Sequence, residues 1–260
     1  MFYNALTPDR YNTHVRFLII SDPHANWHAL QAVLSDAEGQ YDQIICCGDL
    51  VGYNAQPGRV LEWTRQHCAA VIRGNHDKVV GGQENLEWFN EVAQTAARWT
   101  MDALDTEQIQ YLHDLAKGPL KLQHFHIWHG SPRDEDEYVT IAGEAIGCFE
   151  YFELPLAFFG HTHLQGGFFL TKGRIGAVPK VHRDHHERVL ELEPDVLYMI
   201  NPGSVGQPRD GDGRAAYTLF DSEANTVTLR RVRYPIEKTA QEIEDAGLPD
   251  MLAYRLFQGM

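Results

Sequence analysis

Side chains that can bind metal ions follow five short apolar runs of this sequence. The first run is followed by Asp22 and His24, and the last by His161 and His163. Imidazole and carboxylate ligands together suit Mn, Fe, Zn or Ni better than Mg or Ca, which prefer oxygen alone. The sequence therefore predicts a site for divalent transition-metal ions. The full set of candidate ligands is Asp22, His24, Asp49, Asn75, His129, His161 and His163.

Each candidate ligand lies where an apolar, β-rich run gives way to a loop. In α/β folds, binding groups gather outside the carboxyl ends of the strands, so we expect these side chains to meet. Within Asp22/His24 and within His161/His163, a spacing of two residues puts both side chains on one side of an extended segment. Any one of these motifs alone has an ordinary explanation as a turn or a surface strand. Their joint occurrence in one chain indicates a metal centre.

Strands and helices must position these residues, and their expected order is readable from the apolar pattern. The first half of the chain alternates strand and helix, and the second half is rich in short strands. This order predicts an α/β or α+β fold of two packed sheets with helices outside, as one domain spanning 1–260. The expected strands are 15–21, 43–47, 69–72, 120–128, 156–159, 166–171, 196–200, 215–220 and 226–234; the expected helices are 26–38, 57–68, 85–104, 106–115, 237–246 and 250–258.

Composition and charge limit the class of protein. The 260 residues carry a formal net charge of −14, and a broadly acidic surface repels the backbone of DNA or RNA, which argues against nucleic-acid binding. The stretch 1–16 is polar, and no apolar run approaches the roughly 18 residues needed to cross a membrane, so we expect a cytoplasmic protein. The four cysteines form no C-x-x-C pair and are expected to be reduced core thiols.

Five ordered motifs resemble those of the calcineurin-like metallophosphoesterase superfamily. The later segment 201–209 resembles the one that follows in the small bacterial and archaeal phosphodiesterase branch. The resemblance covers most of the chain, and it implies a four-layer αββα sandwich of two mixed β-sheets flanked by helices. The five motifs are Asp22-Pro23-His24, Gly48-Asp49, Gly74-Asn75-His76-Asp77, His129-Gly130 and Gly160-His161-Thr162-His163.

The same resemblance implies two metal sites and a catalytic histidine. His76 would stand beside the leaving-group oxygen, and Asn75 would contact the substrate as well as a metal. Arg209 would be either an additional phosphate clamp or an exposed surface arginine. Two such ions activate a water molecule and stabilise charge on phosphoryl oxygens. The resemblance assigns Asp22, His24 and His163 to the first ion, Asn75, His129 and His161 to the second, and Asp49 to both.

One departure from the superfamily pattern narrows the activity. Phosphoprotein phosphatases and symmetric dinucleoside-tetraphosphate hydrolases carry G-D-x-V-D-R-G, whereas this chain has Gly52 and Tyr53 in place of the second Asp and the Arg. The side chain that would orient His76 and a phosphate-binding cation are therefore both missing from the motif. This argues against a phosphoprotein phosphatase and leaves the partner of His76 open.

These features lead to one preferred function and two alternatives. We expect dinuclear-metal-dependent hydrolysis of phosphoric esters, by a phosphodiesterase that acts on small nucleotide-like substrates and is compatible with a homo-oligomer. The alternatives are a metal-binding scaffold and a nucleotide-sensing protein with little catalysis. Scaffold members of this fold typically lose ligands or the catalytic histidine, whereas all seven ligands and His76 are present here, which favours the enzyme.

Two further segments carry unusual side chains. The polar stretch 181–195, expected to be a mobile loop or a hairpin connection, contains His182, His185 and His186. These histidines either border the site or form a solvated turn, and the turn is favoured. The stretch 83–99 carries more aromatic surface than one helix face buries. It is expected to pack in the core, with packing over the site or in a subunit contact as the alternative.

Overall fold

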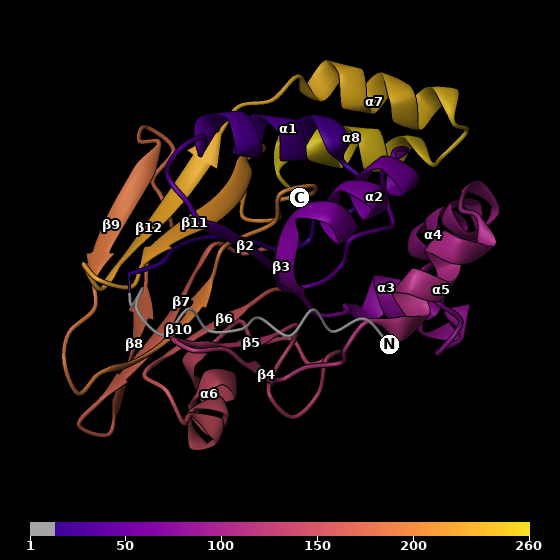
Figure 1. The fold of residues 1–260 in the computed structure, drawn as a ribbon. Helices are drawn as coiled ribbons and strands as arrows, with labels where there is room; N and C mark the ends of the chain where they lie inside the picture. The colour runs from indigo at the N-terminus through magenta and orange to yellow at the C-terminus, as the bar shows by residue number, and fades with distance from the viewer. Residues whose placement is uncertain (1–13) are drawn as a thin grey trace.

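The computed structural model describes residues 14–260, so most of the polar stretch 1–16 lies outside the described residues. Within this range the strands form two mixed sheets that face each other, with helices on their outer sides (Figure 1). This arrangement is the sandwich of two mixed, helix-flanked sheets predicted from the sequence.

The first sheet brings three ligand-bearing segments to one edge. In it, β1 pairs in parallel with β2, and β2 in parallel with β3, whereas β1 pairs antiparallel with β11. Because β1, β2 and β3 run in the same direction, the loops that follow them leave at the same edge. The strands, in spatial order, are β3 (Cys68–Val71), β2 (Gln43–Cys46), β1 (Arg16–Ile20), β11 (Ala215–Asp221), β12 (Thr226–Val232) and β9 (Glu187–Glu191).

The second sheet brings the other ligand-bearing segments to one of its edges. Its strands β5, β6 and β10 are parallel neighbours, so the loops that carry His129, His161 and the segment after Asn201 also leave together. The strands, in spatial order, are β4 (Leu120–Lys121), β5 (His126–Trp128), β6 (Leu156–Phe159), β10 (Leu197–Asn201), β7 (Gly166–Thr171) and β8 (Arg174–Val178).

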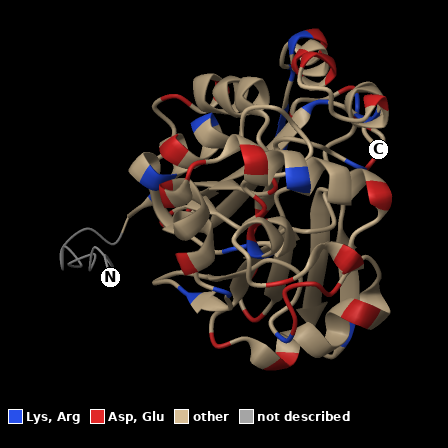
Figure 2. Ribbon diagram, turned by 90° about the vertical axis from the view of Figure 1, so that its right-hand side faces the viewer, with Lys and Arg blue, Asp and Glu red and all other residues tan. Residues whose placement is uncertain are grey.

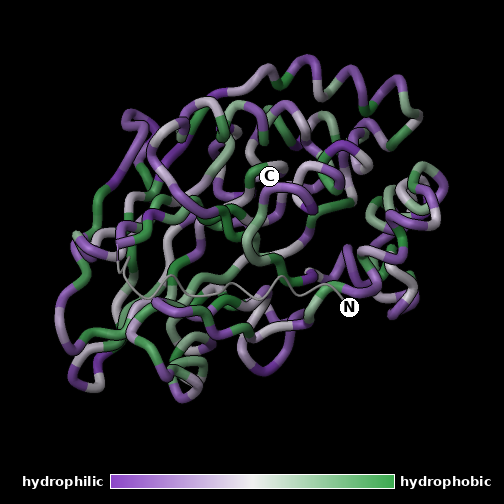
Figure 3. The backbone as a smooth tube through the Cα atoms, in the orientation of Figure 1, coloured by the Kyte–Doolittle hydropathy of each residue, from purple (hydrophilic) through white to green (hydrophobic). Residues whose placement is uncertain are grey.

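Alternate residues of the central strands fill different cores. In β1, Leu18 and Ile20 pack against the outer helices, whereas Phe17 and Ile19 pack between the two sheets. A strand buried on both faces reads as an unbroken apolar run, which is the pattern in the sequence. In Figure 3 the hydrophobic positions accordingly concentrate along the strands in the middle of the molecule.

Helices cover the outer faces of both sheets. On the first sheet, α1 contacts β11 and β12, and α7 packs against α1 (Figure 1). The Asn26 side chain caps α1 by accepting a hydrogen bond from the Ala29 N–H at 3.1 Å. The helices near the first sheet are α1 (Trp27–Asp36), α2 (Pro57–His67), α7 (Ile236–Asp245) and α8 (Asp250–Gln258); α6 (Ala142–Ala145) and the 3-10 helix η2 (Ile146–Tyr151) pack on the second sheet.

Several expected elements differ from those observed. The expected helix 85–104 is divided into the 3-10 helix η1 (Leu86–Trp88) and α4 (Glu91–Ala103), because the Asn90 side chain caps a new helix start. The expected strand 120–128 is the hairpin of β4 and β5. The stretch 181–195 contains β9, which pairs with β12, and β8 was not expected. The short helix α3 (Asn75–Val80) forms where a loop was expected, whereas α5 (Thr106–Asp114) matches the helix expected over 106–115.

The surface and the cysteines match the composition. Acidic positions are spread over the helices and loops of the face seen in Figure 2, with fewer basic positions between them. No helix among residues 14–260 is long and apolar enough to span a membrane. All four cysteines are free thiols; Cys46, Cys47 and Cys148 are buried, and Cys68 is partly buried.

Candidate metal centre

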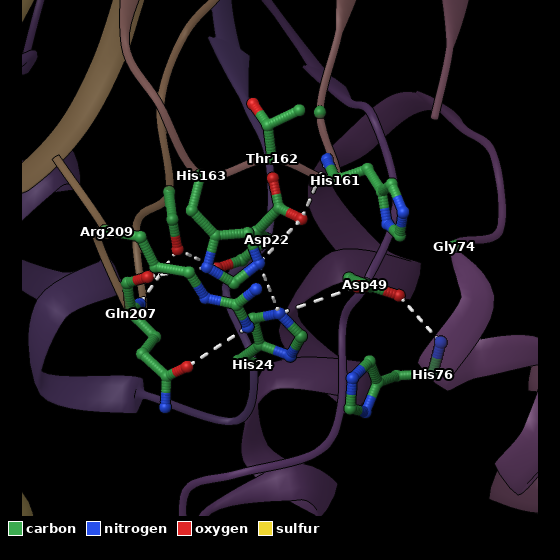
Figure 4. A network of polar contacts seen from close by, with 12 residues as sticks. Asp22, His24, Asp49, Gly74, His76, His161, Thr162, His163, Gln207 and Arg209 are labelled. Carbon is green, nitrogen blue, oxygen red and sulfur yellow. Dashed lines mark hydrogen bonds and ion pairs between the residues drawn. The ribbon is translucent and has the colours of Figure 1, made fainter. Parts of the chain in front are cut away.

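The loops at the strand ends bring the seven candidate ligands together. Six of them form two groups, in each of which the ligand atoms lie within 4.8 Å of one another, and Asp49 belongs to both groups. The Asn75 side-chain oxygen joins the second group, 3.3 Å from Nε2 of His129. Segments distant in the sequence thus meet at one point (Figure 4). The first group is Asp22, His24, Asp49 and His163, and the second is Asp49, His129 and His161.

Three of the imidazoles are oriented by backbone carbonyl groups. A carbonyl oxygen only accepts hydrogen bonds, so the ring nitrogen facing it, Nδ1, carries the proton. The other nitrogen, Nε2, then faces the cluster, and this is the nitrogen through which metal-binding histidines held in this way coordinate an ion. The Nδ1 contacts are His24 to the oxygen of Val51 at 2.8 Å, His129 to that of Cys47 at 2.8 Å, and His163 to that of Gln207 at 2.5 Å.

The buried polar atoms of the first group fit a cation. Nε2 of His24 lies 3.0 Å from Nε2 of His163, and each bears a lone pair when its Nδ1 is protonated. The Asp22 Oδ2 atom is buried without a hydrogen-bond partner among the described residues. Lone pairs that face one another inside a protein are costly unless a positive charge stands between them. The donor set therefore fits divalent ions with mixed nitrogen and oxygen ligands.

The pKa shifts describe the same electrostatic balance. Burial lowers the pKa of His24, and it lowers the pKa of His161 to about 3, so both rings are neutral. Burial would raise the pKa of Asp49, but the imidazoles around it, His129 foremost, hold that pKa well below its ordinary value. At His129, burial would lower the pKa, but the neighbouring Asp49 carboxylate outweighs this effect and raises the pKa to about 10. A bound divalent ion would replace the proton that Asp49 holds on this ring.

The ligand loops have an unusual backbone. Five candidate ligands occupy the left-handed region, which residues other than glycine rarely adopt and which costs roughly 1–3 kcal/mol each. Such a conformation persists only where surrounding contacts hold it. Here the Ser204 hydroxyl donates to the Asp22 carbonyl at 2.8 Å, and the Asn54 side chain donates to the His24 carbonyl at 2.7 Å. The φ angles are 51° at Asp22, 42° at His24, 56° at Asp49, 65° at His161 and 59° at His163.

Asp77 ties two ligand loops to each other. Its fully buried carboxylate accepts hydrogen bonds from the backbone N–H of Leu50 at 2.8 Å, of Val51 at 3.2 Å and of Gly74 at 3.0 Å. Burial raises the pKa of Asp77 to about 7. The motif contained this residue, but the sequence did not reveal its role. The carboxylate fixes the loop after β2 against the start of α3.

His76 stands beside the cluster and not within it. Its backbone N–H donates to Oδ1 of Asp49 at 2.8 Å (Figure 4). Its Nε2 lies 3.0 Å from the Tyr53 hydroxyl, and Arg209 donates to that hydroxyl at 3.1 Å. The Arg209 guanidinium also lies over the Tyr53 ring, 5.5 Å from its centroid. Tyr53, which the sequence did not single out as a site residue, therefore connects the candidate catalytic histidine to the candidate phosphate clamp.

His76 packs against Gly52, the position at which the motif carries an Asp, and its Nδ1 atom is buried without a hydrogen-bond partner among the described residues. A Cβ atom at Gly52 would lie 2.5 Å from Nδ1 of His76, so the imidazole occupies the space that a side chain at this position would need. Burial lowers the pKa of His76 to about 4, which leaves the ring neutral. Because Arg209 donates to the Tyr53 oxygen, the Tyr53 O–H is free to donate to Nε2 of this neutral ring.

A cavity of about 500 Å³ opens over these residues. Site residues, including Arg209, line it together with Trp88, Phe89 and Tyr138. The aromatic stretch 83–99 was expected to pack in the core or over the site. Its residue Phe89 does both, because it packs against the core and also borders the cavity. His182, His185 and His186 are not among the residues that line it. The ring centroids of His182 and His185 lie 6.1 Å apart, and all three histidines are exposed, as expected for a solvated turn.

A family model for the calcineurin-like phosphoesterases matches residues 15–165, which is more than half of the chain. The chain belongs to the calcineurin-like phosphoesterase family. It is also similar to an uncharacterised protein of Methanocaldococcus jannaschii, with 34% identity over 253 residues that cover 93% of this chain and 97% of that protein.

Two solved structures share the fold of this phosphoesterase over nearly its whole length. A metallophosphoesterase from Sphaerobacter thermophilus is 40% identical, with a TM-score of 0.83 and coverage of 95% of this chain and 100% of that one. A hypothetical protein from Pyrococcus horikoshii has a TM-score of 0.76 and covers 95% and 99%, but at 18% identity it shows the fold alone. Family membership and the Asp/His cluster together support metal-dependent phosphoester hydrolysis at a dinuclear site of divalent ions.

Proposed function

We propose that this phosphoesterase is a phosphodiesterase that acts on small nucleotide-like substrates with two divalent transition-metal ions. The observation that carries the proposal is the sharing of Asp49 between two ligand groups, each of which otherwise has its own histidines. A carboxylate common to two groups is the arrangement that two adjacent ions require. Bound there, two such ions activate water and neutralise charge on phosphoryl oxygens.

The residues of the chain divide into roles around this pair of ions. His76, next to the cluster, donates a proton to the leaving-group oxygen or stabilises charge on it. Asn75 contacts a phosphoryl oxygen as well as a metal, and Arg209 binds a second phosphoryl oxygen. The ligands of the first ion would be Asp22, His24 and His163, those of the second Asn75, His129 and His161, with Asp49 between them.

The proposal of a diester and of a small substrate rests on the pocket. The motif positions that carry Asp and Arg in phosphoprotein phosphatases hold Gly52 and Tyr53, and the cation near His76 is Arg209 from a distant loop. A cavity of about 500 Å³ is in the range that encloses a small organic molecule. The scaffold alternative is disfavoured because the ligand set is complete and four of its members line this open cavity: Asp49, Asn75, His161 and His163.

Reconstitution tests the proposal. We expect about two Mn, Fe, Zn or Ni ions per chain by elemental analysis, and hydrolysis of bis(p-nitrophenyl) phosphate at a higher kcat/KM than p-nitrophenyl phosphate. Asp49→Asn should lose both metals and activity, whereas His186→Ala, which removes an exposed imidazole that does not line the cavity, should lose neither. A chain that binds no metal after reconstitution excludes this mechanism.

The role of His76 is tested separately from metal binding. We expect His76→Ala to keep its two ions, because only the backbone N–H of this residue contacts Asp49, while kcat falls by about 100-fold or more through loss of the side chain that serves the leaving-group oxygen. Elemental analysis and steady-state kinetics measure the two effects. Unchanged turnover would mean that another group serves the leaving oxygen.

A further inference from the structure

The mouth of the cavity carries two exposed aromatic side chains. Trp88 is 80% exposed and Tyr138 is 51% exposed, although both line the cavity. Trp88 lies between two anchored residues, since Leu86 and Phe89 pack against the hydrophobic core. A ring presented by an anchored turn loses little freedom when a ligand stacks on it. The mouth is therefore prepared to hold a flat apolar group.

The two rings approach the metal centre from different segments. Tyr138 lies against His161, with ring centroids 4.1 Å apart. Trp88 directly precedes Phe89 in the chain, and the ring centroid of Phe89 lies 4.5 Å from that of His76. A planar group attached to a phosphoryl group at the centre would thus have an aromatic surface within reach in either direction.

The charges at the mouth do not favour additional phosphates. Lys78 lines the cavity, but its ammonium forms an ion pair with Asp136 and lies 3.5 Å from Glu135 and 3.9 Å from Glu84. Asp134 adds another carboxylate to the wall. Like charges brought together in a partly desolvated site repel each other. A second or third phosphate at this mouth would meet carboxylates and a lysine that is already paired.

The other cation of the cavity wall lies deeper. Arg209 contacts the Tyr53 hydroxyl, which in turn contacts His76, so its charge serves the floor of the cavity. One arginine beside two metal ions suits a single phosphoryl group. The carboxylates at the mouth can instead accept hydrogen bonds from the N–H groups of a nucleobase. The floor of the cavity therefore suits a phosphoryl group, and its mouth suits a nucleobase attached to that group.

We infer that the substrate carries one phosphodiester group and a nucleobase, and that the base stacks on Trp88 and Tyr138. The carboxylates of Glu84, Asp134 and Asp136 discriminate against polyphosphates. This inference rests on the proposed function and narrows its substrate class, since it separates nucleoside monophosphate diesters from dinucleoside polyphosphates.

The kinetic test compares two diesters with the same p-nitrophenolate leaving group, one of thymidine and one of methanol, on the Mn-reconstituted full chain. We expect Trp88→Ala to lower the ratio of kcat/KM, thymidine over methyl, by about tenfold, as for the loss of one base–aromatic stack. Tyr254→Ala removes another exposed ring, 54% exposed on α8 and not part of the cavity lining, and leaves this ratio unchanged. An unchanged ratio in Trp88→Ala overturns the inference, whereas hydrolysis of the methyl diester tests the proposed function by itself.

A binding measurement separates the two claims further, because it needs no turnover. Calorimetric titration of the Mn form should show thymidine monophosphate binding about tenfold more tightly than methyl phosphate, with most of this difference lost in Trp88→Ala. Equal affinities in the wild type would overturn the inference even if diesters are hydrolysed. Base-dependent binding without turnover of any diester would support the stacking of the base on Trp88 but refute the proposed function, and with it the diester part of the inference.

The proposed discrimination against polyphosphates is tested by comparing a monophosphate diester with a dinucleoside polyphosphate. We expect the wild type to hydrolyse the thymidine diester with a higher kcat/KM than diadenosine tetraphosphate. The double variant Glu84→Gln/Asp134→Asn should narrow this gap severalfold, because it removes two negative charges from the mouth. A wild type that prefers the tetraphosphate, or a gap that the double variant leaves unchanged, overturns the discrimination against polyphosphates.

Discussion

Tyr53 links two side chains of the site that the sequence motifs do not connect, His76 and Arg209. It stands at the motif position of an arginine, yet its hydroxyl lies between Nε2 of His76 and the guanidinium of Arg209. A cation is nevertheless close to this position, because Arg209, 156 residues away in the chain, donates a hydrogen bond to the Tyr53 hydroxyl. Gly52 permits this arrangement because no side chain there displaces the imidazole.

Replacement of the Tyr53 hydroxyl tests its positioning role. We expect Tyr53→Phe to retain both ions and its KM within a few-fold, while kcat for a diester falls about tenfold, since one buried hydrogen bond to His76 and one from Arg209 are lost. Steady-state kinetics and elemental analysis measure these effects. Tyr254→Phe is the matched control, because its ring is exposed on α8. A kcat equal to that of the wild type would assign Tyr53 a packing role alone.

Among the elements, the loops after the parallel strands do most of the positioning. The strand ends were predictable because apolar runs and the polar residues after them are local features, and the observed β1, β2 and β6 lie within or close to the expected ranges. The break in the expected helix 85–104 depends on a single capping side chain, Asn90. The strand β9 depends on pairing with β12, 35 or more residues later in the chain, which a polar local sequence does not indicate.

The Asp77 carboxylate should control the stability of these loops. We expect Asp77→Ala to lower the free energy of unfolding by about 3 kcal/mol or more, because three buried backbone N–H groups lose their acceptor. Asp77→Asn keeps one oxygen acceptor and should lose less. Urea denaturation of the metal-free proteins gives both values. If the alanine variant is within about 1 kcal/mol of the wild type, the loops are held by other contacts.

At the scale of the whole molecule, the core between the sheets determines whether the two sets of ligand loops meet. Phe158 of the second sheet is fully buried there, with ring centroids 5.1 Å from Phe125 and 6.2 Å from Phe220 of the first sheet. The first sheet supplies Asp49 and the second supplies His161, so the centre spans the interface between the sheets.

Removal of one ring from this core tests its contribution. We expect Phe158→Ala to lower the free energy of unfolding by about 3–5 kcal/mol, the usual cost of a buried aromatic truncation. Phe257→Ala, at a position 48% exposed on α8, should stay within about 0.5 kcal/mol of the wild type. Chemical denaturation measures both. Equal losses in the two variants would contradict the assignment of the inter-sheet core.

The sequence by itself determined the fold class, the family and the set of candidate ligands. These properties depend on residue type, on apolar periodicity and on the order of short motifs, all of which are local. The tertiary structure decided which nitrogen of His24, His129 and His163 faces the cluster, because the carbonyl groups that orient the rings come from other loops. It also decided that the Tyr53 hydroxyl joins His76 to Arg209. Such relations depend on side chains that only the packing of the two sheets brings within bonding distance.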